Sequence, residues 1–114
     1  MSEYQSINPI SKLEAKAKLE VLEGEELCLL LLALSDLDDV EWVQSIYLKY
    51  LNDEDRWIAS AAITGLGHLA RTSGQLDKDL VIATLTDLKK VRVDLKGKIS
   101  DAMSDIEMFN KNNQ

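Results

Sequence analysis

The segment from Leu51 to Gly74 constrains the fold of this chain more than any other part of it. It reads LNDEDRWIASAAITGLGHLARTSG, a polar turn followed by a run of small and aliphatic residues and a glycine. Acidic residues in such a turn are typical of a helix N-cap, and Gly74 is typical of a residue that ends a helix. A helix with so few large polar side chains would expose apolar area on most of its circumference. The segment therefore predicts a helix packed between neighbouring helices.

Helical spacing extends along nearly the whole chain. Apolar residues recur three and four positions apart, and the sequence has one proline and few alternating polar and apolar segments, which indicates helices rather than strands. We expect six helices, over about 9–22, 25–35, 40–51, 56–73, 78–90 and 94–109. Because the connections are short, the sequence predicts an all-α fold of about six helices in three stacked antiparallel hairpins.

Three of these helices carry more specific expectations. Asn8-Pro9 is typical of a helix start, and Asp94 is expected to cap the last helix. The second helix contains the apolar run Leu27 to Leu34 and is hydrophobic on all sides after its first acids, so we expect it to be central and buried. The apolar face of the first helix is predicted to consist of Leu13, Ala17 and Val21 or Leu22.

The length of 114 residues predicts a single domain. We expect a flexible N-terminus over 1–8, a helical domain over 9–109 and a flexible tail over 110–114. No apolar run approaches the roughly 18 residues of a membrane span, and the first residues do not have the pattern of a signal peptide. The single cysteine, Cys28, cannot form an internal disulfide and is expected to be a small core residue. A cytoplasmic protein without a membrane partner is the resulting expectation.

The net charge of −7 is concentrated in the middle of the sequence. Residues 36–56 hold two bases and seven acids. Two acidic groups lie in predicted turns: Asp36, Asp38, Asp39 and Glu41, and Asp53, Glu54 and Asp55. The glycine and the distal glutamate of a calcium loop are absent, so we expect helix caps whose remaining carboxylates could meet a basic partner. Because an α-helical hairpin places successive turns at alternate ends, the two groups are expected at opposite edges of the stack.

The charge distribution disfavours nucleic-acid binding. A net negative charge disfavours contact with a phosphate backbone. The basic run from Lys89 to Lys98 is the one feature that favours it. We keep nucleic-acid binding as a minor alternative.

The sequence offers no arrangement typical of a catalytic or metal site. His68 is the only histidine, so no pair of histidines or histidine and cysteine has metal-ligand spacing, and no neighbouring base would activate a nucleophile. Gly65 and Gly67 lie inside a predicted helix without a phosphate-binding motif around them, which indicates close helix packing. We expect a protein that is not an enzyme and has no cofactor or metal.

One polar stripe remains on the helix that ends at Gly74. Its members recur at steps of four, four, four and three: Arg56, Ser60, Thr64, His68 and Arg71. Trp57 lies at the edge of this stripe. Tryptophan is usually largely buried, which favours a buried Trp57, whereas an exposed one would be an interface anchor. The stripe is the predicted binding surface, with Trp57, Ser60, Thr64 and His68 giving shape and hydrogen bonds.

The same segment resembles the HEAT repeat, in which an acidic turn precedes a helix with regularly placed aliphatic, alanine and leucine-glycine residues. The matching residues are Asp53-Glu54-Asp55, Ile58, Ala62, Leu66-Gly67 and Leu69. Leu95-Lys96 stands where the family has valine and arginine, and Ala59 replaces the family's arginine. The resemblance implies a HEAT-like α-solenoid whose second helices line a concave surface, without the usual aspartate and arginine ladder.

Three later segments resemble a narrower group, the small bacterial HEAT-like proteins that accompany polymorphic toxins. They are GHLARTSGQLD over 67–77, VIATLTDL over 81–88 and SDAMSDIEMF over 100–109. The resemblance implies an immunity protein, as in contact-dependent growth inhibition, that binds a cognate toxin domain, often a nuclease, and blocks its active site. The two acidic groups would then meet a basic toxin domain. A general adaptor or scaffold is the alternative interpretation.

Overall fold

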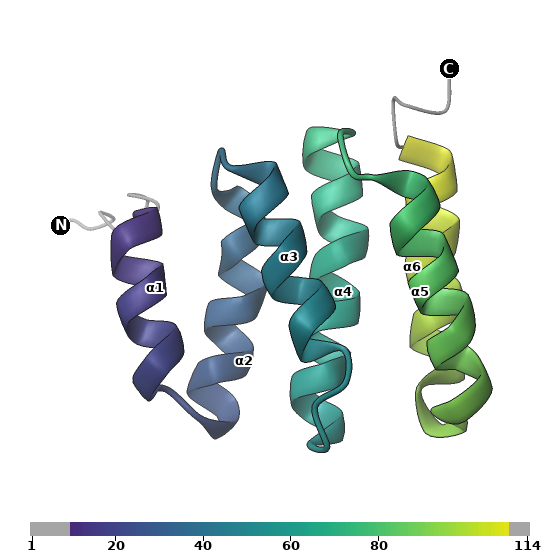
Figure 1. The fold of residues 1–114 in the computed structure, drawn as a ribbon, viewed down its shortest axis with the longest axis horizontal. Coiled ribbons are helices and arrows are strands. Elements are labelled where there is room, and N and C mark those ends of the chain that lie inside the picture. Colours follow the sequence, from purple (N-terminus) through teal and green to yellow (C-terminus); the bar gives the residue numbers. More distant parts are fainter. Residues whose placement is uncertain (1–9, 110–114) are drawn as a thin grey trace, which may run out of the picture.

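The computed structural model describes residues 10–109, and all of its regular structure within that range is helical (Figure 1). The prediction of an all-α fold is confirmed. The predicted flexible segments, 1–8 and 110–114, lie outside the described residues, as does the predicted helix start at Asn8-Pro9. The helices are α1 Lys12–Val21, α2 Gly24–Ala33, α3 Val40–Tyr50, α4 Arg56–Ser73, α5 Lys78–Val91 and α6 Lys96–Phe109, with short 3-10 segments η2 Leu34–Asp36 and η3 Val93–Leu95.

The helix α4 is the centre of the fold. It packs against α2, α3 and α6, while α1 packs on α2 and α5 packs on α6. In Figure 1 the helices α2, α4 and α6 run in the same direction, so their first turns lie together at one end of the stack, which we call the lower end. The turn between α3 and α4 lies at this end and the turn between α2 and α3 at the other. The expectation that the two acidic groups occupy opposite edges is therefore confirmed.

The boundaries of α4 follow from its local sequence. The Asp55 carboxylate accepts a hydrogen bond from the backbone N–H of Trp57 at 2.8 Å, which satisfies one of the free donors of the first turn. At the other end Gly74 adopts a left-handed conformation with φ of 64°, a conformation that glycine adopts without strain. Eleven of the 18 residues of α4 are buried. The predicted sandwiched helix is therefore confirmed.

The glycines of α4 allow neighbouring helices to approach closely. A Cβ atom at Gly65 would overlap the ring of Tyr47 on α3, and one at Gly67 would lie 3.4 Å from the Cα atom of Ala102 on α6. Tyr47 is completely buried, and its hydroxyl donates a hydrogen bond to the carbonyl oxygen of Leu31 on α2. Burial raises the pKa of the Tyr47 hydroxyl, so it remains a donor. The packing interpretation of both glycines is confirmed.

The first two helices differ from the sequence-based expectation. The helix α1 begins at Lys12 with Ser11 as its N-cap, and it buries Ala15, whereas Leu13 and Val21 are exposed. The predicted apolar face is therefore wrong for Leu13, Ala17 and Val21, because α1 turns a different stripe toward α2, whereas the alternative Leu22 is partly buried against the core. The expectation of a fully buried α2 is also wrong: Leu29 and Leu32 remain 60% and 40% exposed.

At the start of α6 the structure places a 3-10 turn rather than a simple cap. Asp94 lies inside η3, where its carboxylate is 3.7 Å from Arg92 Nε and 3.9 Å from Arg56 Nε. The predicted cap is thus replaced by a bridge between the α5–α6 turn and the first residue of α4.

Candidate functional site

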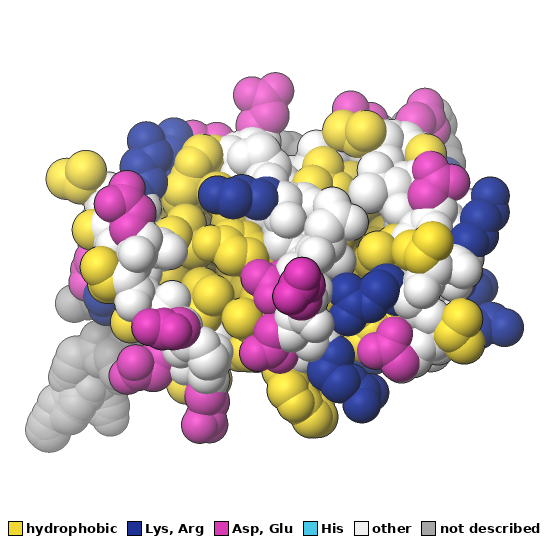
Figure 2. All heavy atoms as spheres, turned by 60° about the horizontal axis from the view of Figure 1, so that its bottom comes forward, with side chains coloured by type: hydrophobic (Ala, Val, Ile, Leu, Met, Phe, Trp, Pro, Cys, Tyr) yellow, Lys and Arg dark blue, Asp and Glu magenta, His cyan; other side chains and the backbone are white. Residues whose placement is uncertain are grey.

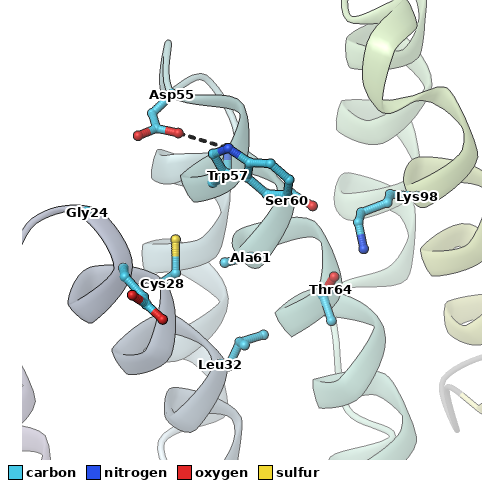
Figure 3. A pocket seen from close by; sticks show the side chains of 10 residues that line it. Gly24, Cys28, Leu32, Asp55, Trp57, Ser60, Ala61, Thr64 and Lys98 are labelled. Carbon is cyan, nitrogen blue, oxygen red and sulfur yellow. Dashed lines mark hydrogen bonds between the residues drawn. The ribbon is translucent and has the colours of Figure 1, made fainter.

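A groove with a volume of about 520 Å³ lies between α2 and α4, with α6 along its far side (Figure 3). We call it the α2–α4 groove. Its lining combines apolar and small side chains with a few charged groups. The lining residues are Gly24, Glu25, Cys28, Leu32, Asp55, Trp57, Ser60, Ala61, Thr64 and Lys98.

The lining residues of α2 form one wall of the groove, and those of α4 form the facing wall. On α2, Glu25, Cys28 and Leu32 are three and four residues apart, so they share one face of the helix. On α4 the wall includes Trp57 and Ala61, which are also four residues apart. Because α2 and α4 start at the same end of the stack, their first turns meet at one end of the groove. Figure 3 shows Asp55 and Trp57 at that end and Leu32 farther along.

Trp57 is the one aromatic residue in the lining of the groove. Its side chain is 67% exposed, so the expectation of a buried Trp57 is wrong. The residue lies in the first turn of α4, at the end of the groove where α2 and α4 begin, which we call the mouth of the groove. The guanidinium carbon of Arg56 lies 5.4 Å from the centre of its ring, within the distance of a cation–π contact. An exposed tryptophan at the mouth of an apolar groove is typical of a protein interface anchor.

The predicted polar stripe on α4 is only partly presented to solvent. Arg56, Thr64, His68 and Arg71 are exposed, but Ser60 is 7% exposed. Because α4 is packed between α2 and α6, only a narrow strip of its surface stays open, and Ser60 falls at the border of that strip. The prediction of Ser60 as an exposed contact residue is therefore wrong, although it lines the groove.

A second, smaller pocket continues from the groove between α4 and α6. Its volume is about 230 Å³, and it shares Thr64 and Lys98 with the groove. His68 and Arg71 extend it along α4, opposite Asp101 and Asp105 of α6 in the same lining. The open part of the predicted stripe thus leads from the groove that Trp57 lines to a pocket lined by charged side chains of α4 and α6.

The second acidic group lies at the lower end, beside the groove. The Asp53 carboxylate accepts a hydrogen bond from the backbone N–H of Asp55 at 2.8 Å, and the Asp55 carboxylate caps α4. Both carboxylates therefore stabilise the turn between α3 and α4. Glu54 is exposed. Asp55 is the member of this group that lines the groove.

The structure separates the first acidic group from this site. Asp39 caps α3 through the backbone N–H of Trp42 at 3.1 Å and pairs with Lys12 Nζ at 2.7 Å. The hydrogen bond from Lys12, and then the one from Trp42, lower the pKa of the Asp39 carboxyl. Asp38, Asp39 and Glu41 line a different polar pocket of about 570 Å³, and Asp36 lies in η2. The capping role of Asp39 is confirmed, and the group does not join the groove.

Sequence reasoning missed the contribution of α2 to the site. Glu25, Cys28 and Leu32 have helical spacing, but the sequence does not show that this face stays open. Cys28 is half-buried: it packs against the hydrophobic core, as predicted, and it also lines the groove, which was not predicted. Lys98, assigned to the basic run, lines the groove from α6.

The lower end carries opposite charges on its two halves. Exposed or partly exposed acids lie at this end on the last turn of α1, the α1–α2 turn, the first turn of α2 and the α3–α4 turn. Together they form what we call the acidic edge: Glu20, Glu23, Glu25, Glu26, Asp53, Glu54 and Asp55. Figure 2 shows acidic side chains along the near edge on the α1–α2 half, and lysines and arginines gathered toward α5 and α6. Such an edge favours a partner with basic groups.

The basic run is partly neutralised within the molecule. Arg92 donates a hydrogen bond to the carbonyl oxygen of Asp53 at 2.9 Å and faces Asp94, and Lys90 Nζ lies 3.7 Å from Asp87. Arg92 is therefore held by the α3–α4 turn, whereas Lys90 stays exposed beside Asp87.

Comparisons with known proteins identify no relative of this chain, so the site is interpreted from its own geometry. The sequence matches no family model, and neither the curated proteins nor the solved structures include a match. Among residues 10–109, no helix is long and apolar enough to cross a membrane. The same range holds no group of three or more histidine, cysteine, aspartate or glutamate side chains that could bind a metal ion. The fold and site define an all-α protein with an open, largely apolar groove next to an acidic edge.

The pKa of the Cys28 thiol reports on the negative charges around the groove. Burial, and then the negative charges of Asp55, Glu25 and Asp53, raise the pKa of this thiol above its ordinary value of 9.0. Because alkylation requires the thiolate, the rate with iodoacetamide should rise with pH through an inflection above that value. Glu25→Gln should move the inflection down and increase the rate at pH 8, whereas Asp38→Asn at the other end should change neither. An inflection at or below pH 9.0 in the unmodified protein contradicts this assignment.

Proposed function

We propose that this protein is an immunity protein, which binds a cognate bacterial toxin domain and neutralises it by covering its active or substrate-binding surface. The observation that carries the proposal is the exposed Trp57 at the mouth of an apolar groove beside the acidic edge. The combination suits a protein partner, because aromatic anchors supply binding energy and surrounding charges supply specificity. A HEAT-like arrangement of the helices and a cytoplasmic location belong to the same proposal.

The chemistry of the groove favours recognition over reaction. The raised pKa of Cys28 keeps the thiol protonated near neutral pH, so it is a poor nucleophile. The remaining charged groups of the lining are Glu25, Asp55 and Lys98, and Asp55 is engaged as the cap of α4. These groups can orient a charged partner without a chemical step.

The acidic edge supports a toxin domain that acts on nucleic acid. A protein that binds a phosphate backbone presents lysine and arginine side chains on its substrate-binding surface. An acidic surface is attracted to those cations and accelerates association. The resemblance of the segments over 67–77, 81–88 and 100–109 to toxin-associated proteins supports the same class of partner.

Affinity capture followed by a growth assay tests this function. The tagged protein should retain one dominant basic partner from a lysate of the source bacterium, identified by mass spectrometry. Expression of the captured domain alone should stop growth of a host strain, and co-expression of this chain should restore it. Several partners of unrelated sequence, none of which stops growth, would instead identify a general adaptor. Strong retention of duplex DNA or RNA at 150 mM salt would contradict the proposal in favour of the nucleic-acid alternative.

A further inference from the structure

We infer that the element of the partner that enters the α2–α4 groove is a short amphipathic helix with lysine or arginine at one end. The inference rests on the proposed function in so far as the partner is a protein. It specifies what the groove recognises, which the general proposal leaves open. Three properties of the groove lead to it: the secondary structure of its walls, its exposed apolar side chains and the position of its carboxylates.

The walls of the groove exclude one common way of binding a peptide. Its lining residues between Gly24 and Leu32 belong to α2, those from Trp57 to Thr64 to α4, and Lys98 to α6. Backbone N–H and C=O groups inside helices are already paired, so these walls offer no edge to which a strand could be added. Each wall spans about two helical turns, roughly 12 Å. A groove between helices of this length suits a helix that inserts side chains at i, i+3 or i+4, and i+7.

Large apolar side chains along the groove are exposed to solvent. Trp57 and Leu32 project from opposite walls, as Figure 3 shows, and both are substantially exposed. Leu29 is exposed and lies four residues after Glu25 and three before Leu32, so α2 continues the apolar surface beside the lining. A helix with leucine-like side chains on one face would remove these groups from water together with its own apolar face.

The carboxylates define the orientation of the partner helix. Glu25 and Asp55 lie in the lining where α2 and α4 begin, and the rest of the acidic edge surrounds that end. Lys98 comes from the first turn of α6, so it lies on the α6 side of the groove, across from the α2 wall that carries Glu25. A cationic end therefore fits toward Glu25 and Asp55, and an acidic end placed there would be repelled. This orientation distinguishes the inference from a general apolar surface.

Synthetic helices provide the probe. The first is a stapled 14-residue helix with leucines at i, i+4 and i+7 and three lysines near one end. The second carries glutamates in place of the lysines, and the third carries serines in place of the leucines. Binding is measured by the fluorescence of the protein and by protection of Cys28 from iodoacetamide at pH 8, since Cys28 is the single cysteine and lines the groove.

The basic amphipathic helix should bind and slow Cys28 alkylation by at least about fivefold, and each of the other two helices should bind at least about tenfold more weakly. Leu32→Glu and Glu25→Lys should each weaken its binding about tenfold or more. Glu41→Lys, on the separate polar pocket, should leave it unchanged. Circular dichroism establishes that the variants are folded, which is expected because the three side chains are exposed.

Several results would overturn the inference. Equal binding of the glutamate helix, or binding without protection of Cys28, contradicts the stated occupant. Protection of Cys28 that rises with protein concentration in the absence of any peptide, together with a dimer in light scattering, identifies a second copy of this chain as the occupant. A captured toxin domain that binds Leu32→Glu and Glu25→Lys as tightly as the unmodified protein overturns the groove inference and leaves the proposed function intact. Peptide binding as described, without a captured toxin, supports the groove inference and contradicts the proposed function.

Discussion

Replacing Gly65 by alanine is expected to reduce the free energy of unfolding by about 2–4 kcal/mol, although alanine is the better helix former. The added Cβ atom would overlap the ring of Tyr47 and lie 2.8 Å from its hydroxyl oxygen. Tyr47 has no exposed surface into which it could move. A shift of the ring would also break the hydrogen bond to the carbonyl of Leu31, which leaves a buried hydroxyl without its partner. Steric overlap should therefore outweigh the gain of up to about 1 kcal/mol in helix propensity.

Urea unfolding followed by circular dichroism measures this effect, and the other helical glycines supply matched controls. A Cβ at Gly97 meets no atom within 4 Å, so Gly97→Ala should be neutral or stabilise by up to about 1 kcal/mol. A Cβ at Gly67 would lie 3.2 Å from an Asp105 carboxylate oxygen, so Gly67→Ala should have a small effect. The double variant Tyr47→Leu with Gly65→Ala should be less destabilised than the sum of its parts. If Gly65→Ala is as stable as Gly97→Ala, the close packing of α3 on α4 is wrong.

The features that were predicted correctly from sequence depend on local chemistry. Asp55 and Gly74 mark the ends of α4 because capping depends on a side chain and a backbone conformation within a few residues. Gly65 and Gly67 indicate close packing because a helix tolerates such residues at a cost that a neighbouring helix can offset. The position of the two acidic groups at opposite ends follows from the alternation of helices along the chain.

The features that were missed depend on which neighbour covers which face. In α1, one stripe contains Leu13 and Val21, and another contains Ala15 and Leu19; both have helical spacing, and only the packing on α2 selects the second. Exposure of Trp57 likewise depends on what covers the first turn of α4.

The groove itself combines α2 with α4, whose lining residues are about 30 positions apart in the sequence. Periodicity within one helix cannot show that a second helix leaves the same side open. This explains why the predicted stripe located Thr64 and His68 on the open strip of α4 but did not include Cys28 and Leu32 on the facing wall.

Trp57→Ala is expected to weaken binding of the cognate toxin domain by about 2–4 kcal/mol, roughly 30- to 1,000-fold in Kd. The loss should occur mainly in the dissociation rate, because the tryptophan contributes contact area after the complex forms. Stability should change little, since the side chain is 67% exposed and its contact with Arg56 is worth about 0.5–1 kcal/mol. Phe109→Ala, another partly exposed aromatic residue at the end of α6, is the matched control and should leave affinity unchanged.

Charge reversal on the acidic edge should change the association rate constant of the complex. Glu54→Lys should slow association, and the effect should be larger at 20 mM than at 150 mM NaCl, because salt screens interactions between exposed charges. Glu41→Lys, at the opposite end of the stack, should have no such effect, because it lies beside the separate polar pocket. Biolayer interferometry at the two salt concentrations measures both rate constants. If Trp57→Ala leaves dissociation unchanged while Glu41→Lys slows association, the partner binds the upper end and the assignment of the lower end as the interface is wrong.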